Sequence, residues 1–334
     1  MDKLHINSSK PYDVYIGENL FDACAEYIKE NFAPQTKVLI VADENVPFDY
    51  DLRCAIKDAG FSVKTLTVPG RDKTKTLSHA GQFIEWLLHK EYGRDDLLIA
   101  LGGGTVSDFT GFVASIYKRG MKYINVPTTL LSMADACIGG KTALDVIGEK
   151  NVVGTVYSPS LVVCDTALLK SAPQSVINQG YAEAIKCAVI CDKEFFDNIT
   201  TMTREEVIER ALRIKADFIE KDEFDNNERH MLNLGHTFAH AIEKLTDFTV
   251  PHGNAVSMGL VMAAEYSNEK GMLSLDEVEK IKQKLAFFSL PVECKYSKNK
   301  IWDNIYNDKK IKGDKISIIL PVKIGECIIL EEKI

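Results

Sequence analysis

Three of the seven histidines in this 334-residue chain fall within residues 232–253. His236 and His240 are four residues apart, so a helix would place both rings on one face, and His252 follows twelve residues later. Zinc takes three or four nitrogen, oxygen or sulfur ligands, and a catalytic site leaves one position open. The spacing allows all three histidines to bind one metal, or one of them to handle protons. The glutamate of an H-E-x-x-H helix is missing, which argues against a metalloprotease.

A carboxylate and an ammonium group occur three residues apart in "GYAEAIK", as Glu183 and Lys186. A helix would place them on one face, where such a pair is usually a surface ion pair. The surrounding Ala and Ile residues indicate a buried face instead. The sequence therefore leaves both a surface pair and a functional pair open.

Cationic and amide side chains recur in apolar or glycine-rich surroundings. Lys141 lies in "CIGGKTALD", Lys215 lies in a predicted helix, and Arg229 and Asn233 precede His236 by seven and three residues. Each residue alone has a structural or solvated role as its simplest explanation. Together they predict a metal beside a cationic pocket, which suits a substrate that carries carboxylate or phosphate.

The stretch "LIALGGGTVSD" predicts a strand, a turn of three glycines at 102–104 and the start of a helix. The glycines permit close approach of a ligand, and the helix N-terminus suits a pyrophosphate, although the spacing is not G-x-G-x-x-G. Asp43 and Asn45 end an earlier strand, where an acid can hold ribose hydroxyls or simply form a turn. Lys73 and Lys75 either hold phosphate or belong to a solvated loop.

The first half of the chain alternates short strands with helices, which predicts a largely parallel sheet with helices on both faces. Helices are expected at 76–93 and 107–120. Apolar runs rich in Val, Ile and Leu predict strands at 37–43, 62–70, 96–104 and 123–129.

After Pro173 the pattern becomes helical, with clear 3.6-residue periodicity at 205–222 and 255–271. The tail at 315–330 reads as a hairpin packed on these helices. The expected fold is therefore a Rossmann-like α/β domain over 1–172, followed by a mainly α-helical domain over 173–334.

Composition narrows the class of protein. Hydrophobic residues make up 46% and charged residues 26%, as in a soluble globular protein, and the net charge of −8 disfavours a general nucleic-acid or membrane-surface binder. The N-terminus has no signal-peptide pattern, and no apolar run approaches the length of a membrane span. The eight cysteines show no C-x-x-C pairing, so we expect reduced, buried or half-buried thiols in a cytoplasmic protein.

From about residue 37 to 325 the sequence resembles the 3-dehydroquinate synthase family of the sugar phosphate cyclases. The resemblance rests on "GGGTVSDFTGFVASIYKRG", "VPTTLLSMADACIGGKTALD", "GEKNVVGT", "GYAEAIK", "LNLGHTFAHAIE" and "HGNAVSMGLVMAA". It implies conversion of 3-deoxy-D-arabino-heptulosonate 7-phosphate to 3-dehydroquinate and phosphate. The steps implied are transient oxidation by NAD, β-elimination of phosphate, reduction and intramolecular aldol closure.

The resemblance also implies a role for the polar residues of the helical half. Zinc or cobalt would be bound by Glu183, His236 and His252, whereas His240 matches a proton-handling group that is not a ligand. The remaining substrate contacts of the family match residues in both halves. They are Lys141, Asn151, Asn233, His240 and Lys309 or Lys310 for phosphate, Lys215 and Arg229 for carboxylate, and Asp135 and Lys186 for hydroxyls.

Arg119 matches an arginine that enters the neighbouring subunit's site in the family, so the resemblance implies a homodimer. It implies NAD binding in the N-terminal domain and metal binding in the helical domain. The matching NAD contacts are Asp43, Asn45, Asp72, Lys75, Gly103, Gly104, Thr105, Asp108, Thr128, Thr129, Lys141, Lys150, Leu168 and Ser171.

Three positions depart from the family pattern: Ser107 replaces the usual Gly before Asp108, Asp72 replaces Glu, and Asp145 stands where many members have Asn. Inosose synthases lack the "GGKT" setting and replace Asn233, and both features are intact here, which favours the dehydroquinate product. A metal-assisted alcohol dehydrogenase on the same fold and a non-catalytic metal or nucleotide binder remain the competing hypotheses.

Overall fold

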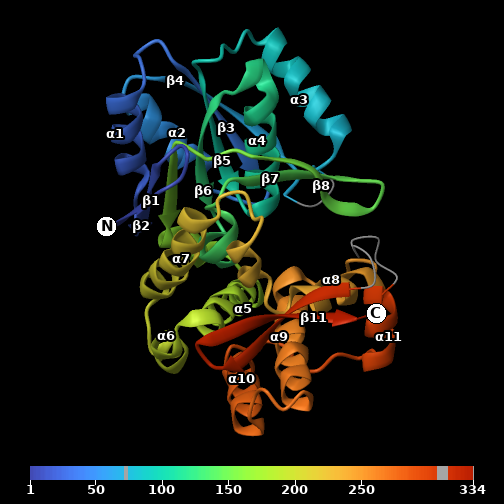
Figure 1. The fold of residues 1–334 in the computed structure, drawn as a ribbon. Coiled ribbons are helices and arrows are strands. Elements are labelled where there is room, and N and C mark those ends of the chain that lie inside the picture. The colour runs from blue at the N-terminus through green and yellow to red at the C-terminus, as the bar shows by residue number, and fades with distance from the viewer. Residues whose placement is uncertain (71–73, 307–314, 334) are drawn as a thin grey trace. The chain divides into compact units, whose positions relative to one another are not determined.

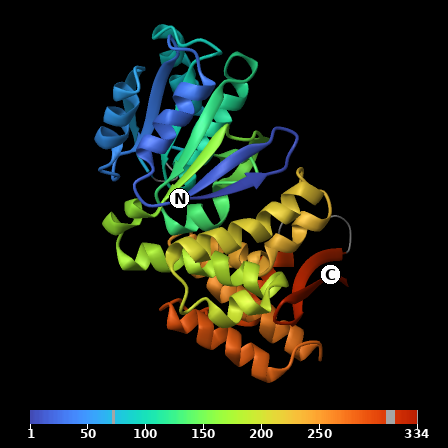
Figure 2. The ribbon, with the colours of Figure 1, turned by 90° about the vertical axis from the view of Figure 1, so that its left-hand side faces the viewer.

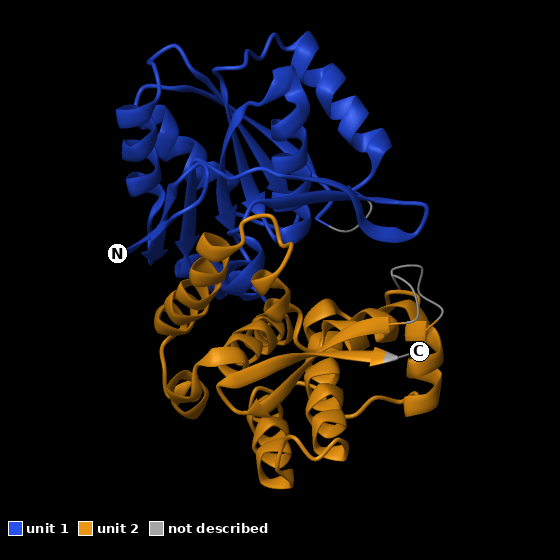
Figure 3. Ribbon diagram, viewed as in Figure 1, with its two compact units in different colours: residues 1–172 blue, residues 173–334 orange. Residues whose placement is uncertain are grey.

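The computed structural model describes residues 1–70, 74–306 and 315–333. The chain forms two compact units, Met1–Ala172 and Pro173–Ile334 (Figure 3). Four residues to which a role was assigned from the sequence lie outside the described residues: Asp72, Lys73, Lys309 and Lys310.

Unit 1 is built on a seven-stranded sheet with the order β1-β2-β9-β6-β5-β3-β4. Only β1 and β2 pair in antiparallel fashion, and every other pair in this sheet is parallel. The strands are β1 (Asp2–Ile6), β2 (Tyr12–Gly17), β3 (Lys37–Asp43), β4 (Ser62–Val68), β5 (Leu97–Gly102), β6 (Lys122–Pro127) and β9 (Leu161–Asp165).

Helices cover both faces of this sheet (Figures 1 and 2). Alternate side chains of β3 contribute to two cores on opposite faces of the sheet. Val38 and Ile40 belong to one apolar cluster, and Leu39 and Val41 belong to the other. The first cluster includes residues of α1 and α2, and the second includes residues of α3 and α4. These helices are α1 (Phe21–Asn31), α2 (Asp49–Asp58), α3 (Leu77–His89) and α4 (Gly104–Ile116).

Short elements complete unit 1. The antiparallel hairpin of β7 (Lys141–Val146) and β8 (Glu149–Val156) is separate from the main sheet. A π-helical segment, η2 (Ser132–Ala136), lies between β6 and β7. The 3₁₀ segments are η1 (Tyr117–Arg119) and η3 (Thr166–Ser171).

Unit 2 is mainly helical and packs around α9, which is buried around most of its circumference. The two strands of the tail form an antiparallel hairpin. The elements are α5 (Gln174–Cys191), α6 (Lys193–Asn198), α7 (Arg204–Lys221), the 3₁₀ segment η4 (Glu228–Asn233), α8 (His236–Leu245), α9 (His252–Glu269), α10 (Leu275–Phe287), α11 (Lys298–Tyr306), β10 (Lys315–Lys323) and β11 (Glu326–Lys333).

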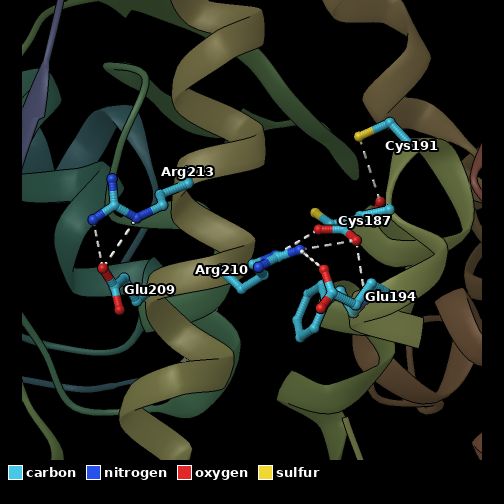
Figure 4. A network of polar contacts seen from close by, with 8 residues as sticks. Cys187, Cys191, Glu194, Glu209, Arg210 and Arg213 are labelled. Carbon is cyan, nitrogen blue, oxygen red and sulfur yellow. Dashed lines mark hydrogen bonds and ion pairs between the residues drawn. The ribbon is translucent and has the colours of Figure 1, made fainter. Parts of the chain in front are cut away.

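Ion pairs anchor α7, the helix that carries Lys215 (Figure 4). Arg210 Nε lies 2.5 Å from Asp192 Oδ2, and Arg210 Nη2 lies 3.1 Å from Glu194 Oε2. Burial of Asp192 alone would raise its pKa, but the hydrogen bonds from Arg210 and the Phe195 backbone hold that pKa below its usual value. Thr203 and Glu206 form a capping box at the start of the same helix.

The predicted fold class is confirmed: a largely parallel, Rossmann-like sheet is followed by a helical unit. The helix expected at 107–120 begins earlier, at Gly104, and its last residues form η1, where Lys118 and Arg119 have positive φ. The expectation for the cysteines is wrong at one position, because Cys191 is exposed. All eight are free thiols, and no helix among the described residues is long and apolar enough to cross a membrane.

Candidate metal centre and cofactor site

Glu183, His236 and His252 come together in unit 2 from three different helices, α5, α8 and α9. One potential ligand atom from each residue lies within 4.8 Å of the other two. No other group of three such residues within this distance occurs among the residues that the structure describes. The two-histidine, one-carboxylate set matches the donors that a catalytic zinc uses.

The distances within this cluster fit a single ion. Glu183 Oε1 lies 3.4 Å from His252 Nε2 and 3.6 Å from His236 Nε2. A tetrahedral zinc with bonds of about 2.1 Å holds its ligand atoms about 3.4 Å apart. The geometry therefore leaves space at the centre for a metal of this size.

Glu183 is a buried carboxylate, with a side chain that is 1% exposed. Neither of its oxygens accepts a well-formed hydrogen bond from the described residues, although Lys186 Nζ lies 2.5 Å from Oε2. Burial alone would raise the pKa of Glu183, but Lys186 and His236 hold it well below its usual value. Because Lys186 is on Oε2, the remaining oxygen, Oε1, is the one available to a metal.

The second ring nitrogen of each histidine faces an oxygen. His236 Nδ1 lies 3.2 Å from the Leu234 carbonyl, and His252 Nδ1 lies 3.4 Å from Glu243 Oε1. Such contacts fix the tautomer that presents Nε2 as a metal ligand. Burial opposes the charged form of His252, but Glu183 and Glu243 outweigh it and raise the pKa of His252 to about 10. The two carboxylates thus favour a positive charge at His252.

Glycines allow the three ligand-bearing helices to approach closely. A Cβ on Gly253 would lie 2.5 Å from Gln179 Cβ on α5, and a Cβ on Gly259 would lie 2.2 Å from the Gly235 carbonyl oxygen. Gly253 follows His252, and Gly235 precedes His236 with a φ of +77° that side chains rarely adopt. The backbone contacts therefore set where the two histidines lie relative to α5.

Near the metal ligands, unit 2 contains a cavity of about 1210 Å³ that is lined in part by Asn233, His236 and His240. His240 lies one turn after His236 on α8, with ring centroids 5.6 Å apart, but it does not belong to the group of potential ligands. Lys215 and Arg229 are buried, and Arg229 Nη1 donates to the Glu223 carbonyl at 2.6 Å. The ring of His240 thus borders the cavity without belonging to the group of potential ligands.

In unit 1, Asp43 and the glycine turn meet at the carboxyl edge of the sheet. β4 is added on one side of β3 and β5 on the other, so the order of successive parallel strands reverses at the β3–β5 boundary, where open α/β sheets bind ligands. A Cβ on Gly102 would lie 3.3 Å from Asp43 Cβ. The predicted contact Asn45 donates its backbone N–H and its Nδ2 to Asp43 Oδ1, at 2.9 and 3.0 Å.

The N-terminus of α4 opens at this edge. Gly103 is the N-cap, so the predicted contacts Gly104 and Thr105 begin the helix, where N–H groups suit a phosphate. The Thr128 N–H donates to the Gly102 carbonyl at 3.0 Å. The methyl group of Thr129 lies 3.3 Å from a Cβ placed on Gly103, so both predicted threonines lie beside the turn.

Lys75 connects two of the predicted contacts. Its Nζ lies 2.7 Å from Asp108 Oδ2 and 2.5 Å from Asn151 Oδ1, and the residue is only 6% exposed. Asn151 has a φ of +55°, and its N–H donates to Asp145 Oδ1 at 2.8 Å. Asp145, one of the departures from the family pattern, therefore accepts a hydrogen bond that holds Asn151 in place.

The other predicted residues of unit 1 are more dispersed. Lys141 begins β7 and is exposed, Lys150 lies in β8, and Asp135 lies in η2. The Leu168 side chain belongs to the core, and its carbonyl accepts a hydrogen bond from Ser171 Oγ at 3.1 Å. Arg119 is exposed and ends η1.

One buried carboxylate of the site was not identified from the sequence. Glu243, which contacts His252, is 3% exposed. The only indication in the sequence was that Glu243 lies on the same helix as His236 and His240. Its partner, His252, belongs to another helix, so residue spacing does not reveal the contact.

Known proteins resemble this chain along most of its length. The profile described as "3-dehydroquinate synthase N-terminal" matches residues 65–179, and "3-dehydroquinate synthase C-terminal" matches residues 180–311. The 3-dehydroquinate synthase of Desulforamulus reducens is 36% identical over 97% of this chain and 94% of its own length. Relatedness thus extends along nearly the whole sequence.

Two solved structures share the fold at 22% identity. A 2-deoxy-scyllo-inosose synthase complexed with carbaglucose-6-phosphate, NAD⁺ and Co²⁺ has a TM-score of 0.90 and covers 99% of this chain and 97% of its own. The 2-epi-5-epi-valiolone synthase of Streptomyces hygroscopicus, with NAD⁺ and Zn²⁺ bound, has a TM-score of 0.88 and covers 100% and 95%. With the two profiles and the full-length relative, these findings show that the chain belongs to the 3-dehydroquinate synthase family.

Proposed function

We propose that this protein converts 3-deoxy-D-arabino-heptulosonate 7-phosphate to 3-dehydroquinate and phosphate, with NAD and zinc or cobalt as cofactors. The observation that carries the proposal is the convergence of Glu183, His236 and His252 in a chain related to 3-dehydroquinate synthases over nearly its whole length. Local cationic residues suit the anionic substrate in spite of the net charge of −8.

Glu183 Oε1 and the Nε2 atoms of His236 and His252 would hold the metal. A zinc or cobalt ion there supplies a Lewis acid that polarises a substrate oxygen. Three protein ligands leave a coordination position for that oxygen. The protein residues supply a buried negative charge and two rings whose Nδ1 atoms already face oxygen acceptors.

The carboxyl edge of the sheet in unit 1 would hold the dinucleotide. NAD supplies a hydride acceptor that is regenerated within each turnover. Asp43 would hold the ribose hydroxyls and the N–H groups at the start of α4 would hold the pyrophosphate, which the proximity of Asp43 to the glycine turn supports. The other residues proposed to contact NAD are Lys75, Asp108, Thr128, Thr129 and Lys150.

The substrate's two anionic ends would be held by separate sets of residues. Lys215 and Arg229 are buried cations that suit the carboxylate. The phosphate would contact Lys141, Asn151, Asn233 and His240, while Asp135 and Lys186 hold hydroxyl groups. Oxidation of the hydroxyl group on the carbon next to C6 gives a ketone, which acidifies the C6 proton. Phosphate can then leave by β-elimination.

His240 is proposed as the group that moves protons. Its ring is exposed and borders the cavity beside the metal ligands. Histidine is the side chain most often used as a general acid or base near neutral pH. The side chain can therefore exchange protons with the substrate without giving up a metal ligand.

Two proposals concern the whole molecule. The exposed Arg119 would complete the site of a second subunit, so we expect a homodimer. We also place the protein in the cytoplasm, in keeping with eight free thiols.

The function is tested by incubating the purified protein with the heptulosonate phosphate, NAD and zinc. Mass spectrometry should detect 3-dehydroquinate in an amount equal to the phosphate released. A cyclitol product, or an oxidised substrate that still carries its phosphate, would contradict the proposal.

A further inference from the structure

Glu243 lies behind the candidate metal centre, in the last turn of α8. The residue is 3% exposed, and its Oε1 lies 3.4 Å from His252 Nδ1. A carboxylate at this position is costly, since burial disfavours its charge and a helix C-terminus repels an anion. A contact with a metal-binding histidine would offset these costs.

The ring of His252 is held between two carboxylates. Its Nε2 lies 3.4 Å from Glu183 Oε1, and its Nδ1 lies 3.4 Å from Glu243 Oε1. His236 shows the same arrangement, with Nε2 toward Glu183 and Nδ1 toward the Leu234 carbonyl. Both rings therefore present Nε2 to the same centre and place Nδ1 on an oxygen.

Charge gives Glu243 a second role. Glu183 is the only carboxylate within the group of potential ligands, and Lys186 Nζ lies 2.5 Å from its Oε2. Lys186 therefore offsets the charge that Glu183 would offer a divalent ion. Glu243 adds a negative charge on the far side of the His252 ring, where it attracts the ion without occupying a coordination position.

We propose that Glu243 is a positioning residue for the metal. It accepts the His252 Nδ1 proton, fixes the tautomer that presents the Nε2 lone pair and increases the affinity for a divalent cation. This inference rests on the proposed metal role of His252, so its test must separate the two.

The test measures zinc affinity by chelator competition in four variants and the wild type. Glu243→Ala should weaken zinc binding about 100-fold, and Glu243→Gln, which keeps an acceptor but loses the charge, about 10-fold. Glu269→Gln is the matched control, because Glu269 is an exposed acid on α9 that pairs with Lys298. His252→Ala tests the metal site itself.

The same samples separate positioning from a structural role. With excess zinc, Glu243→Gln should recover most of the wild-type rate, and its cobalt-substituted form should show a shifted visible absorption spectrum. Zinc affinities within about twofold of wild type in both Glu243 variants would overturn the inference, even if thermal unfolding of the metal-free protein changed.

If Glu243→Ala fails to fold, Glu243→Gln alone decides the question, since it preserves the shape of the side chain. Wild-type affinity in His252→Ala would instead overturn the proposed metal site, and the role of Glu243 with it. Loss of zinc in His252→Ala with no change in Glu243→Gln would overturn only the inference about Glu243.

Discussion

Glu183 Oε1 lies 3.4 Å from Nε2 of His252, although the two residues belong to different helices. Their approach depends on contact between the backbones of α5 and α9 at Gly253. The proposed chemistry of the protein therefore depends on helix packing that brings a buried carboxylate to a ring nitrogen.

Glu183→Gln should abolish zinc binding and destabilise the metal-free protein by about 3 kcal/mol, because it leaves the buried charge of Lys186 without this partner. Combining it with Lys186→Met should restore much of the stability but not zinc binding. Urea unfolding and metal analysis measure the two effects. Equal stability of Glu183→Gln and wild type would contradict the buried ion pair.

His240→Ala should keep zinc and lose most of the rate, by ~100-fold or more, because His240 is proposed to move protons rather than bind metal. Metal analysis and steady-state kinetics on one preparation provide the measurement. A loss of zinc equal to that in His236→Ala would show that His240 is a ligand.

Gly253→Ala should weaken zinc binding, since the new Cβ would lie 2.5 Å from Gln179 and push the start of α9 away from α5. Chelator competition measures the change. Gly81→Ala on α3 is the control, because a Cβ there meets nothing within 4 Å. Unchanged affinity in both variants would mean that this contact does not set the position of His252.

Lys75→Met should weaken NAD binding about tenfold and also raise the inhibition constant of inorganic phosphate, because Lys75 contacts both Asp108 and Asn151. Lys64→Met, at an exposed position on β4, is the control. Calorimetry with NAD and inhibition by phosphate test the two effects. If neither NAD binding nor inhibition by phosphate changed, Lys75 would not belong to the proposed site.

The sequence predicts those elements whose pattern is local. The strand expected at 37–43 matches β3 residue for residue. A short run of Val, Leu and Ile between helices is typical of a buried strand. The start of α4 was predicted three residues late, because glycines disfavour helix and their run was therefore interpreted as a turn. The strands β1, β2 and β9 were not predicted, and their pairing joins distant parts of the chain.

The site shows the same division. Helical periodicity correctly places the rings of His236 and His240 near each other, at 5.6 Å between centroids. Periodicity cannot show that His236 Nε2 faces Glu183, or that Glu243 faces His252, because these contacts join separate helices. Family resemblance supplied the ligand assignment, and packing shows how those side chains meet.

The most direct test of the proposed function follows phosphate release and absorbance at 340 nm in one reaction with the heptulosonate phosphate and NAD. The proposed function predicts steady phosphate release with no net gain of NADH. Phosphate release should stop after chelation and recover when zinc or cobalt is added. Accumulation of NADH without phosphate release would identify a metal-assisted dehydrogenase and contradict the proposal.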